Sequence, residues 1–216
     1  GDLTYLSKHA RRMLDEAGFP DCQICASNSL DEYIIRDMLM QGAEVDSFGV
    51  GERLITSSSA PVFGGVYKLA AAEDKDGKII PKIKISENVI KITNPCFKNL
   101  WRLYDRESGK AIADVITLFE EIIDDSKPYT IFDKNYTWKT KVVENFRAVQ
   151  LREKIFDHGT NISKQRTLKE LQSYCAEQVD TLWEEVKRFE YPHQYYVDLS
   201  QKLWDEKHRL LSEKTL

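Results

Sequence analysis

Apolar side chains recur every three or four positions over the first seventeen residues of the chain. This spacing predicts an amphipathic helix over residues 3–17. Gly18 and Pro20 follow directly, and both are typical of the end of a helix. The apolar positions that define the predicted face are Leu3, Leu6, Ala10, Met13, Leu14 and Ala17.

Strand-like and helical runs then alternate up to about residue 56. The stretch CQICAS (22–27) predicts a short strand, and the helix after it begins at Ser/Asn capping candidates and closes at Gly42. A second short strand, VDSFGVG (45–51), leads into a helical turn, ERLIT (52–56). Alternation with short loops predicts βα units around a parallel sheet or barrel, where ligands bind at the carboxyl ends of the strands.

From residue 62 the pattern becomes β-rich. The strand-like run PVFGGVYKLAAAED, the turn KDGK and the alternating run IIPKIKIS predict one hairpin, and LWRLYD-RESGK-AIADVITL predicts a second. The runs PYTIFD and VVENFRAVQLREKIFDHGTNIS continue this character. Two helices are then predicted, one over 167–189 with a capping box at Thr167 and Glu170, and one beyond Pro192.

Composition and charge describe an ordinary soluble globular chain. Hydrophobic residues make up 42% and charged residues 31%, and the formal net charge is −4. This balance offers no basic face for nucleic acid. No apolar run approaches a membrane span, and no signal peptide opens the chain. We therefore expect neither a nucleic-acid nor a membrane partner, and a cytoplasmic location.

The cysteines and histidines indicate little metal chemistry. Cys22 and Cys25 form a C-x-x-C, which suits a redox pair or half of a zinc site, but CQICA reads as a short buried strand. Structural, reduced cysteines are the simplest interpretation, with metal or redox use as the alternative. The histidines, none of which has a partner at metal or triad spacing, are His9, His158, His193 and His208.

The stretch DSFGVGERLIT (46–56) combines a strand, a Gly-x-Gly turn and a helix start. Backbone N–H groups at such a turn can hold a phosphate, but glycine also serves any tight turn. Glu52 places a carboxylate where a phosphate would lie. Asn28, at the end of the preceding strand, is a candidate either for a ribose hydroxyl or for a helix cap. Gly64, Gly65 and Lys68 are weaker candidates for ligand contacts, since a bulge at the glycines and a solvated lysine on the following strand are the commoner explanations.

Several stretches together resemble the second half of bacterial nicotinate phosphoribosyltransferases. They are GDLTYLSK, ASNSLDEYII, DSFGVGERLITS, PVFGGVYKLA, LYDRESGKAIADVI, QVDTLWEEVKRFEYPH and YYVDLSQKLWDEKH. The resemblance implies an α/β fold: the last βα units of a type II phosphoribosyltransferase irregular barrel, then a β-rich α+β region with terminal helices. Residues 1–60 would complete the barrel at its phosphoribosyl-binding edge, and residues 61–216 would complete the second domain.

The resemblance also implies a reaction, in which nicotinate attacks 5-phosphoribosyl pyrophosphate to give nicotinate mononucleotide and pyrophosphate. It implies Mg²⁺ on the pyrophosphate, ATP coupling through a phosphorylated histidine, NAD salvage as the setting, and a homodimer. The implied substrate contacts in this chain are Asp2, Asn28, Gly49, Gly51 and the amide of Glu52.

Two departures from the family pattern limit these expectations. The nicotinate-binding Arg and the phosphohistidine would lie upstream of Gly1, so no catalytic residue is assigned here and the chain alone is expected to be inactive without the N-terminal half. Many relatives carry Thr where this chain has Glu52. Either that side chain points away, with Arg53 supplying compensating charge, or phosphate binding is weaker.

Two alternative functions remain open. A nicotinamide phosphoribosyltransferase-like enzyme would share the barrel, but such relatives have a glycine-richer turn and lack GGVYKL. A non-catalytic truncated dimerisation module is the other alternative.

Overall fold

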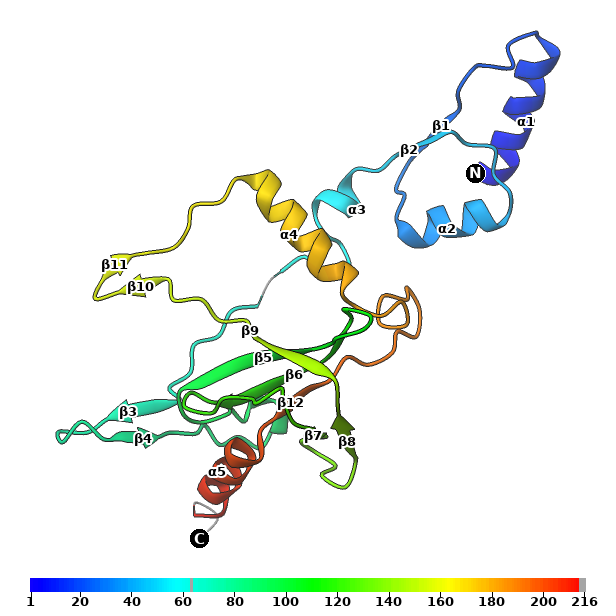
Figure 1. Cartoon of the computed structure of the whole chain (residues 1–216). Coiled ribbons are helices and arrows are strands. Elements are labelled where there is room, and N and C mark those ends of the chain that lie inside the picture. Colours follow the sequence, from blue (N-terminus) through cyan, green and yellow to red (C-terminus); the bar gives the residue numbers. More distant parts are fainter. Residues whose placement is uncertain (63, 214–216) are drawn as a thin grey trace. The chain divides into compact units, whose positions relative to one another are not determined.

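The structure, a computed structural model, describes residues 1–62 and 64–213 and divides into two compact units (Figure 1). Unit 1 is Gly1–Val66 and unit 2 is Tyr67–Leu216. Within the described ranges, no helix is both long enough and apolar enough to cross a bilayer. The assignment of the first sixty residues to a barrel stays a prediction.

Unit 1 alternates helices with two short strands, as the sequence predicts. Its elements, in order, are α1 (Leu3–Glu16), β1 (Cys25–Ser27), α2 (Glu32–Met40), β2 (Ser47–Gly49) and α3 (Glu52–Ile55). β1 and β2 pair in parallel, which confirms the βα pattern at the level of secondary structure. A small core of Ala26, Leu30 and Met38 holds α2 against the strands.

The cap of α2 differs from the expected Ser/Asn candidates. Asp31 caps the helix, and its carboxylate accepts a hydrogen bond from the amide of Ile34 at 2.8 Å. Asn28 and Ser29 have φ values of 115° and 49°, which are incompatible with the extended backbone of an N-cap. Gly42, with φ of 73°, lies just beyond the end of the helix, as expected.

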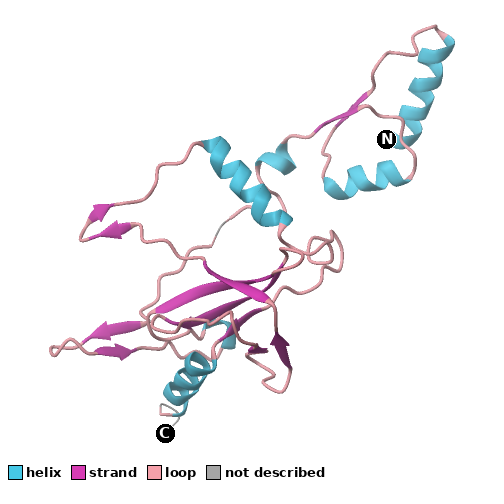
Figure 2. Cartoon of the chain, viewed as in Figure 1, coloured by secondary structure: helices cyan, strands magenta, loops and turns pink. Residues whose placement is uncertain are grey.

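Unit 2 is built on a four-stranded sheet in the order β12-β6-β5-β9, whose strands are labelled in Figure 1 and drawn in magenta in Figure 2. β5 (Lys98–Asp105) pairs antiparallel with β6 (Ala111–Leu118) and with β9 (Phe146–Gln150), while β12 (Val197–Leu199) runs parallel to β6. The β5–β6 pair is the second predicted hairpin, and it is confirmed. A register shift lies between Leu103 and Tyr104.

Shorter hairpins surround this sheet. β3 (Ala71–Glu73) and β4 (Ile79–Pro81) form the first predicted hairpin around Gly77, whose φ is 78°. The other elements are β7 (Tyr129–Phe132), β8 (Thr140–Val143), β10 (Phe156–Asp157), β11 (Thr160–Asn161) and the 3₁₀ turn η1 (Val89–Lys91). The strand expected from residue 61 is confirmed only at β3, since residues 64–70 form no regular structure, and Phe63 lies outside the described residues.

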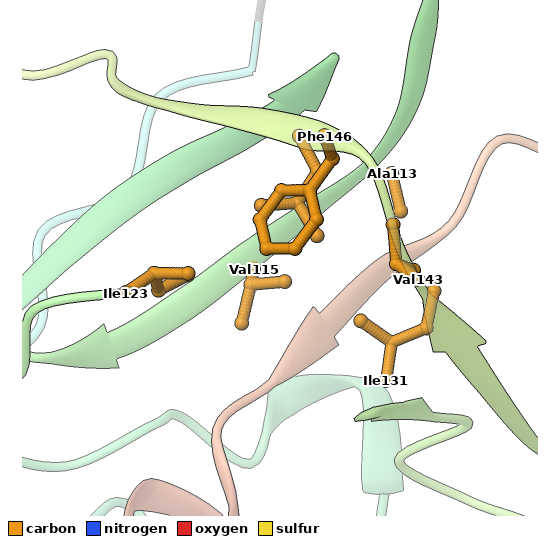
Figure 3. Close-up of a cluster of buried hydrophobic side chains, with 7 residues drawn as sticks. Ala113, Val115, Ile123, Ile131, Val143 and Phe146 are labelled. Carbon is orange, nitrogen blue, oxygen red and sulfur yellow. The ribbon is translucent and has the colours of Figure 1, made fainter. Parts of the chain in front are cut away.

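The core of unit 2 lies between one face of the sheet and the β7–β8 hairpin. Side chains alternate along the strands, so Leu103 and the facing Ala113 and Val115 point to the same side. Figure 3 shows the Phe146 ring lying over this face, with Ile131 and Val143 of the hairpin closing it. Phe146 and Leu103 are fully buried.

Two predicted helices are shorter than expected. α4 (Leu168–Asp180) has the predicted capping box at Thr167 and Glu170, but it ends before residue 189. Lys110 donates to the carbonyl oxygen of Asp180 at 2.6 Å, and the amide of Ala111 donates to that of Thr181 at 2.8 Å. The carbonyl groups at the end of α4 therefore accept hydrogen bonds from the start of β6, and the helix ends there.

The prediction of a helix directly beyond Pro192 is also wrong for the first residues of that segment. Residues 197–199 form β12, and α5 (Gln201–Ser212) begins only after the N-cap Ser200. Pairing with the exposed edge of β6 satisfies the backbone of this segment, so the chain extends there instead of coiling.

Candidate functional site

The parallel pairing of β1 and β2 brings two predicted site segments to one edge. Ser27 at the end of β1 is the register partner of Gly49 at the end of β2. Asn28 follows Ser27, and the turn Val50–Glu52 follows Gly49, so both leave the carboxyl ends of neighbouring strands. This is the edge at which open parallel sheets bind ligands.

The two glycines of the turn are required for different reasons. A Cβ atom on Gly49 would lie 3.1 Å from Ser27 Oγ and 3.3 Å from Ser27 Cβ, so glycine permits the close strand pairing. Ser27 Oγ also donates to the Gly49 carbonyl oxygen at 3.3 Å. Gly51 has open space around it and forms the N-cap of α3, with φ −118° and ψ −104°.

Glu52 is the first residue of α3, and its side chain is exposed. The carbonyl oxygen of Gly51 accepts hydrogen bonds from the amides of Leu54 and Ile55, both at 3.0 Å. The amide groups of the first residues of a helix, here Glu52 and Arg53, have no intrahelical acceptor. The Glu52 amide therefore belongs to the part of the turn that can donate to an anion, while its carboxylate can extend into solvent.

The sequence suggests that Arg53 compensates the charge of Glu52, and this stays a prediction. In the structure the Arg53 guanidinium forms an ion pair with the carboxylate of Asp31, the cap of α2. The amide of Ile34, and after it the charge of Arg53, hold the pKa of Asp31 below its usual value. Arg53 thus links the glycine turn to α2. Asp31 was not among the site residues predicted from the sequence. An aspartate directly before a helical run is, however, a recognised N-cap signal.

A hollow of about 400 Å³ lies beside this ion pair. It is open between the start of α2 and α3. Its polar lining comes from the Asp31–Arg53 pair, Glu32 and three consecutive serines, 57–59. Its size is in the range of small-molecule sites.

Asp2 has a structural task in this unit. Its carboxylate accepts a hydrogen bond from the Tyr5 amide at 3.0 Å and caps α1. Among the described residues, no contact joins Asp2 to the glycine turn, so the structure brings Asn28 and residues 49–52 together but not Asp2.

The remaining candidates show no built site. Cys22 and Cys25 are free, exposed thiols. The predicted strand is present as β1 and buries Ala26, but the two cysteines are not buried as expected. Across residues 1–62 and 64–213, no three His, Cys, Asp or Glu side chains are grouped to hold a metal. Gly64, Gly65 and Lys68 are exposed in the irregular segment before β3.

Several known proteins are similar to this chain in sequence. A family model described as the nicotinate phosphoribosyltransferase C-terminal domain matches residues 97–207. The chain is 42% identical to the nicotinate phosphoribosyltransferase of Bacillus subtilis over 213 residues, covering 99% of this chain and 43% of that protein. It is 30% identical to the Dictyostelium discoideum nicotinate phosphoribosyltransferase over 225 residues, covering 97% of this chain and 37% of that protein.

A solved structure agrees at the level of fold. The human nicotinic acid phosphoribosyltransferase superposes with a TM-score of 0.68 at 21% identity, covering 98% of this chain and 39% of the human chain. The chain thus spans about two fifths of the length of these relatives. With the family model covering its C-terminal region, the chain belongs to the nicotinate phosphoribosyltransferase family and corresponds to the C-terminal part of such a protein.

Proposed function

We propose that this chain is the C-terminal part of an enzyme that joins nicotinate to 5-phosphoribosyl pyrophosphate, forming nicotinate mononucleotide and pyrophosphate in NAD salvage. Family membership supports the reaction class. The observation that carries the proposal is the shared edge of β1 and β2, which places Asn28 beside the glycine turn. We further propose that residues 1–60 contribute the last units of a βα barrel.

In this proposal the turn holds the 5′-phosphate of the substrate. Gly49 lets the backbone approach closely, and the amides of Gly51 and Glu52 donate to phosphate oxygens. Asn28, from the neighbouring strand end, donates to a ribose hydroxyl or a pyrophosphate oxygen. Transfer of the ribosyl group develops positive charge at C1 while pyrophosphate leaves, so this chain would act by positioning the substrate and by electrostatic stabilisation.

Mg²⁺ and ATP enter the proposal only through the family resemblance. No described side chains form a cluster of three that suits a metal, so we assign no metal ligand in this chain and no step through either group. The phosphohistidine role falls to none of the four histidines. We also propose that the chain acts together with the N-terminal half of the same enzyme, that the enzyme is a homodimer, and that it is located in the cytoplasm.

A chimera with a relative tests the function. We expect the purified chain to show no turnover of nicotinate and 5-phosphoribosyl pyrophosphate. We expect turnover when it replaces the matched part of the Bacillus subtilis enzyme, to which it is 42% identical. The chimera should prefer nicotinate to nicotinamide. A folded chimera without activity would contradict the proposal, and turnover by the chain alone would contradict the need for the other half.

Two substitutions at Glu52 test the role of its amide in that chimera. Glu52→Pro removes the N–H at the first helical position, where proline is tolerated, and should raise the KM for 5-phosphoribosyl pyrophosphate about tenfold or more. Glu52→Ala keeps the N–H and should leave this KM unchanged or lower it. Circular dichroism establishes that both variants are folded. Equal KM values for the two would exclude the amide as a phosphate donor.

A further inference from the structure

Unit 2 contains a cavity of about 440 Å³ between α5 and the segment around η1. It has no part in the proposed phosphate turn, which belongs to unit 1. Its lining combines aliphatic, aromatic and cationic side chains, and among the described residues none of those that line it is a carboxylate. The lining residues used below are Val89, Ile90, Lys134, Trp204, Lys207 and His208.

Two lysines meet at this cavity without a carboxylate between them. The half-buried Lys207 ammonium donates to Asn94 Oδ1 at 2.9 Å, a neutral acceptor. Burial, and then the charge of Lys134, lower the pKa of Lys207. A cation that is partly desolvated and faces a second cation gains strongly from an added anion.

Two carboxylates, those of Asp133 and Asp198, interact with the charge of Lys134, but neither of them lines the cavity. Its ammonium donates to the carbonyl oxygen of Val197 at 3.3 Å. Asp133 Oδ1 accepts hydrogen bonds from the amides of Asn135 and Tyr136, at 2.8 and 3.0 Å. Asp198 is buried in a separate hollow beside β7 and β8. Among the described residues that line the cavity, no acidic side chain therefore stands beside the two lysines.

The remaining lining residues suit a ligand with a planar organic ring. The rings of Trp204 and His208 stack with centroids 3.6 Å apart, and the Trp204 indole donates to the Lys134 carbonyl oxygen at 3.1 Å. The stack is thereby held in place. On the side of η1, Val89 and Ile90 leave 73% and 92% of their surface exposed, apolar area that a ligand would cover.

We propose that this cavity binds a small organic anion with a planar ring, its carboxylate or phosphate between Lys134 and Lys207 and its ring against the aromatic and aliphatic walls. The volume admits a ligand up to about the size of a mononucleotide. Charge-assisted hydrogen bonds from the two ammonium groups supply the orientation, and the apolar walls supply burial.

Calorimetric titration of the full 216-residue chain tests this site. The probes are AMP, which joins a ring to a phosphate, nicotinate, which joins a ring to a carboxylate, and inorganic phosphate, which has no ring. We expect saturable binding of AMP or nicotinate, and the tighter of the two identifies the anion. Inorganic phosphate should bind at least about tenfold more weakly.

Lysine substitutions locate the binding. Lys207→Met, and separately Lys134→Met, should weaken binding of the better probe about tenfold, while Lys202→Met on the same helix should not. Thermal melts establish that each variant is folded, and Lys134 is exposed, so its replacement is not expected to unfold the chain. The proposal would be overturned by no binding of either ring anion, by cavity variants that bind the better probe as tightly as the unsubstituted chain does, or by phosphate binding as tight as that of AMP.

Discussion

At the residue scale, the two glycines of one turn have different physical roles. Gly49 is required by its neighbour, since its missing side chain leaves room for Ser27 on the paired strand. Gly51 has open space and is an N-cap. The sequence predicts a tight turn at this point, but it does not reveal which glycine is sterically confined.

Replacing each glycine by alanine should separate these roles. Gly49→Ala brings a methyl group to 3.1 Å from Ser27 Oγ, so we expect a loss of about 1 to 3 kcal/mol in the free energy of local opening. Gly51→Ala should change it by less than about 0.5 kcal/mol. Amide hydrogen exchange of β1 and β2 measures both effects. Equal exchange rates in the two variants would contradict the proposed confinement of Gly49.

Asp198 is a second residue whose environment matters, because its surroundings shift the pKa of its carboxyl group. The residue is 5% exposed. Burial, then repulsion by Asp133, raise the pKa of its carboxyl group to about 6, and Lys134 offsets this only in part. In the unfolded chain an aspartate ionises near its ordinary pKa of about 3.9.

This raised pKa predicts a pH-dependent contribution to stability. Between the two pKa values the folded protein binds more protons than the unfolded chain, so the contribution of Asp198 is present below about pH 4 and lost as the pH rises through about 6. Asp198→Asn should therefore be more stable than the native chain at pH 7 by on the order of 1 kcal/mol, a gain that shrinks toward pH 4. Urea unfolding at both pH values measures the difference, and a difference independent of pH would refute this assignment.

At the element scale, α4 is attached to the sheet through a buried polar network. Arg102 donates to both carboxylate oxygens of Asp114, at 2.8 and 3.0 Å, and Tyr195 donates to the same carboxylate at 2.8 Å. Arg102 and Tyr104 also donate to Gln178 in the last turn of α4, at 3.4 and 3.3 Å. The hydrogen bonds to Asp114 raise the pKa of Arg102, so the guanidinium stays charged.

Removing the carboxylate should be costly because it leaves a partly buried cation without its partner. We expect Asp114→Ala to lower the free energy of unfolding by about 3 kcal/mol or more. Lys127→Ala, which removes the exposed pair with Asp124, should cost less than about 1 kcal/mol. Chemical denaturation followed by tryptophan fluorescence reports on unit 2. A loss for Asp114→Ala no greater than that for Lys127→Ala would contradict the network's role.

Local signals predicted most elements correctly. The helical spacing of residues 3–17, the capping box at Thr167 and the turn around Gly77 are all local, and each is confirmed. The end of α4 and the strand β12 were missed because both depend on hydrogen bonds to β6, which is more than sixty positions distant in the chain.

At the scale of the whole molecule, the chain forms two units with separate cores. Among the described residues, the core cluster of unit 1 has three buried residues and that of unit 2 has seven, Phe146 among them. A core of three side chains supplies little stabilisation by itself. This agrees with a chain that covers about two fifths of its relatives' length, in which unit 1 would gain contacts from the rest of the protein.

The sequence alone determined the helices and hairpins with local signals, the glycine turn and the family resemblance, because periodicity, caps and motifs are encoded by neighbouring residues. The tertiary structure alone decided that Arg53 pairs with Asp31, that α4 stops at Asp180, and that Lys134 and Lys207 share a cavity. Each of these depends on groups distant in the sequence, and the charges and hydrogen bonds of such groups acquire partners only when the chain has folded.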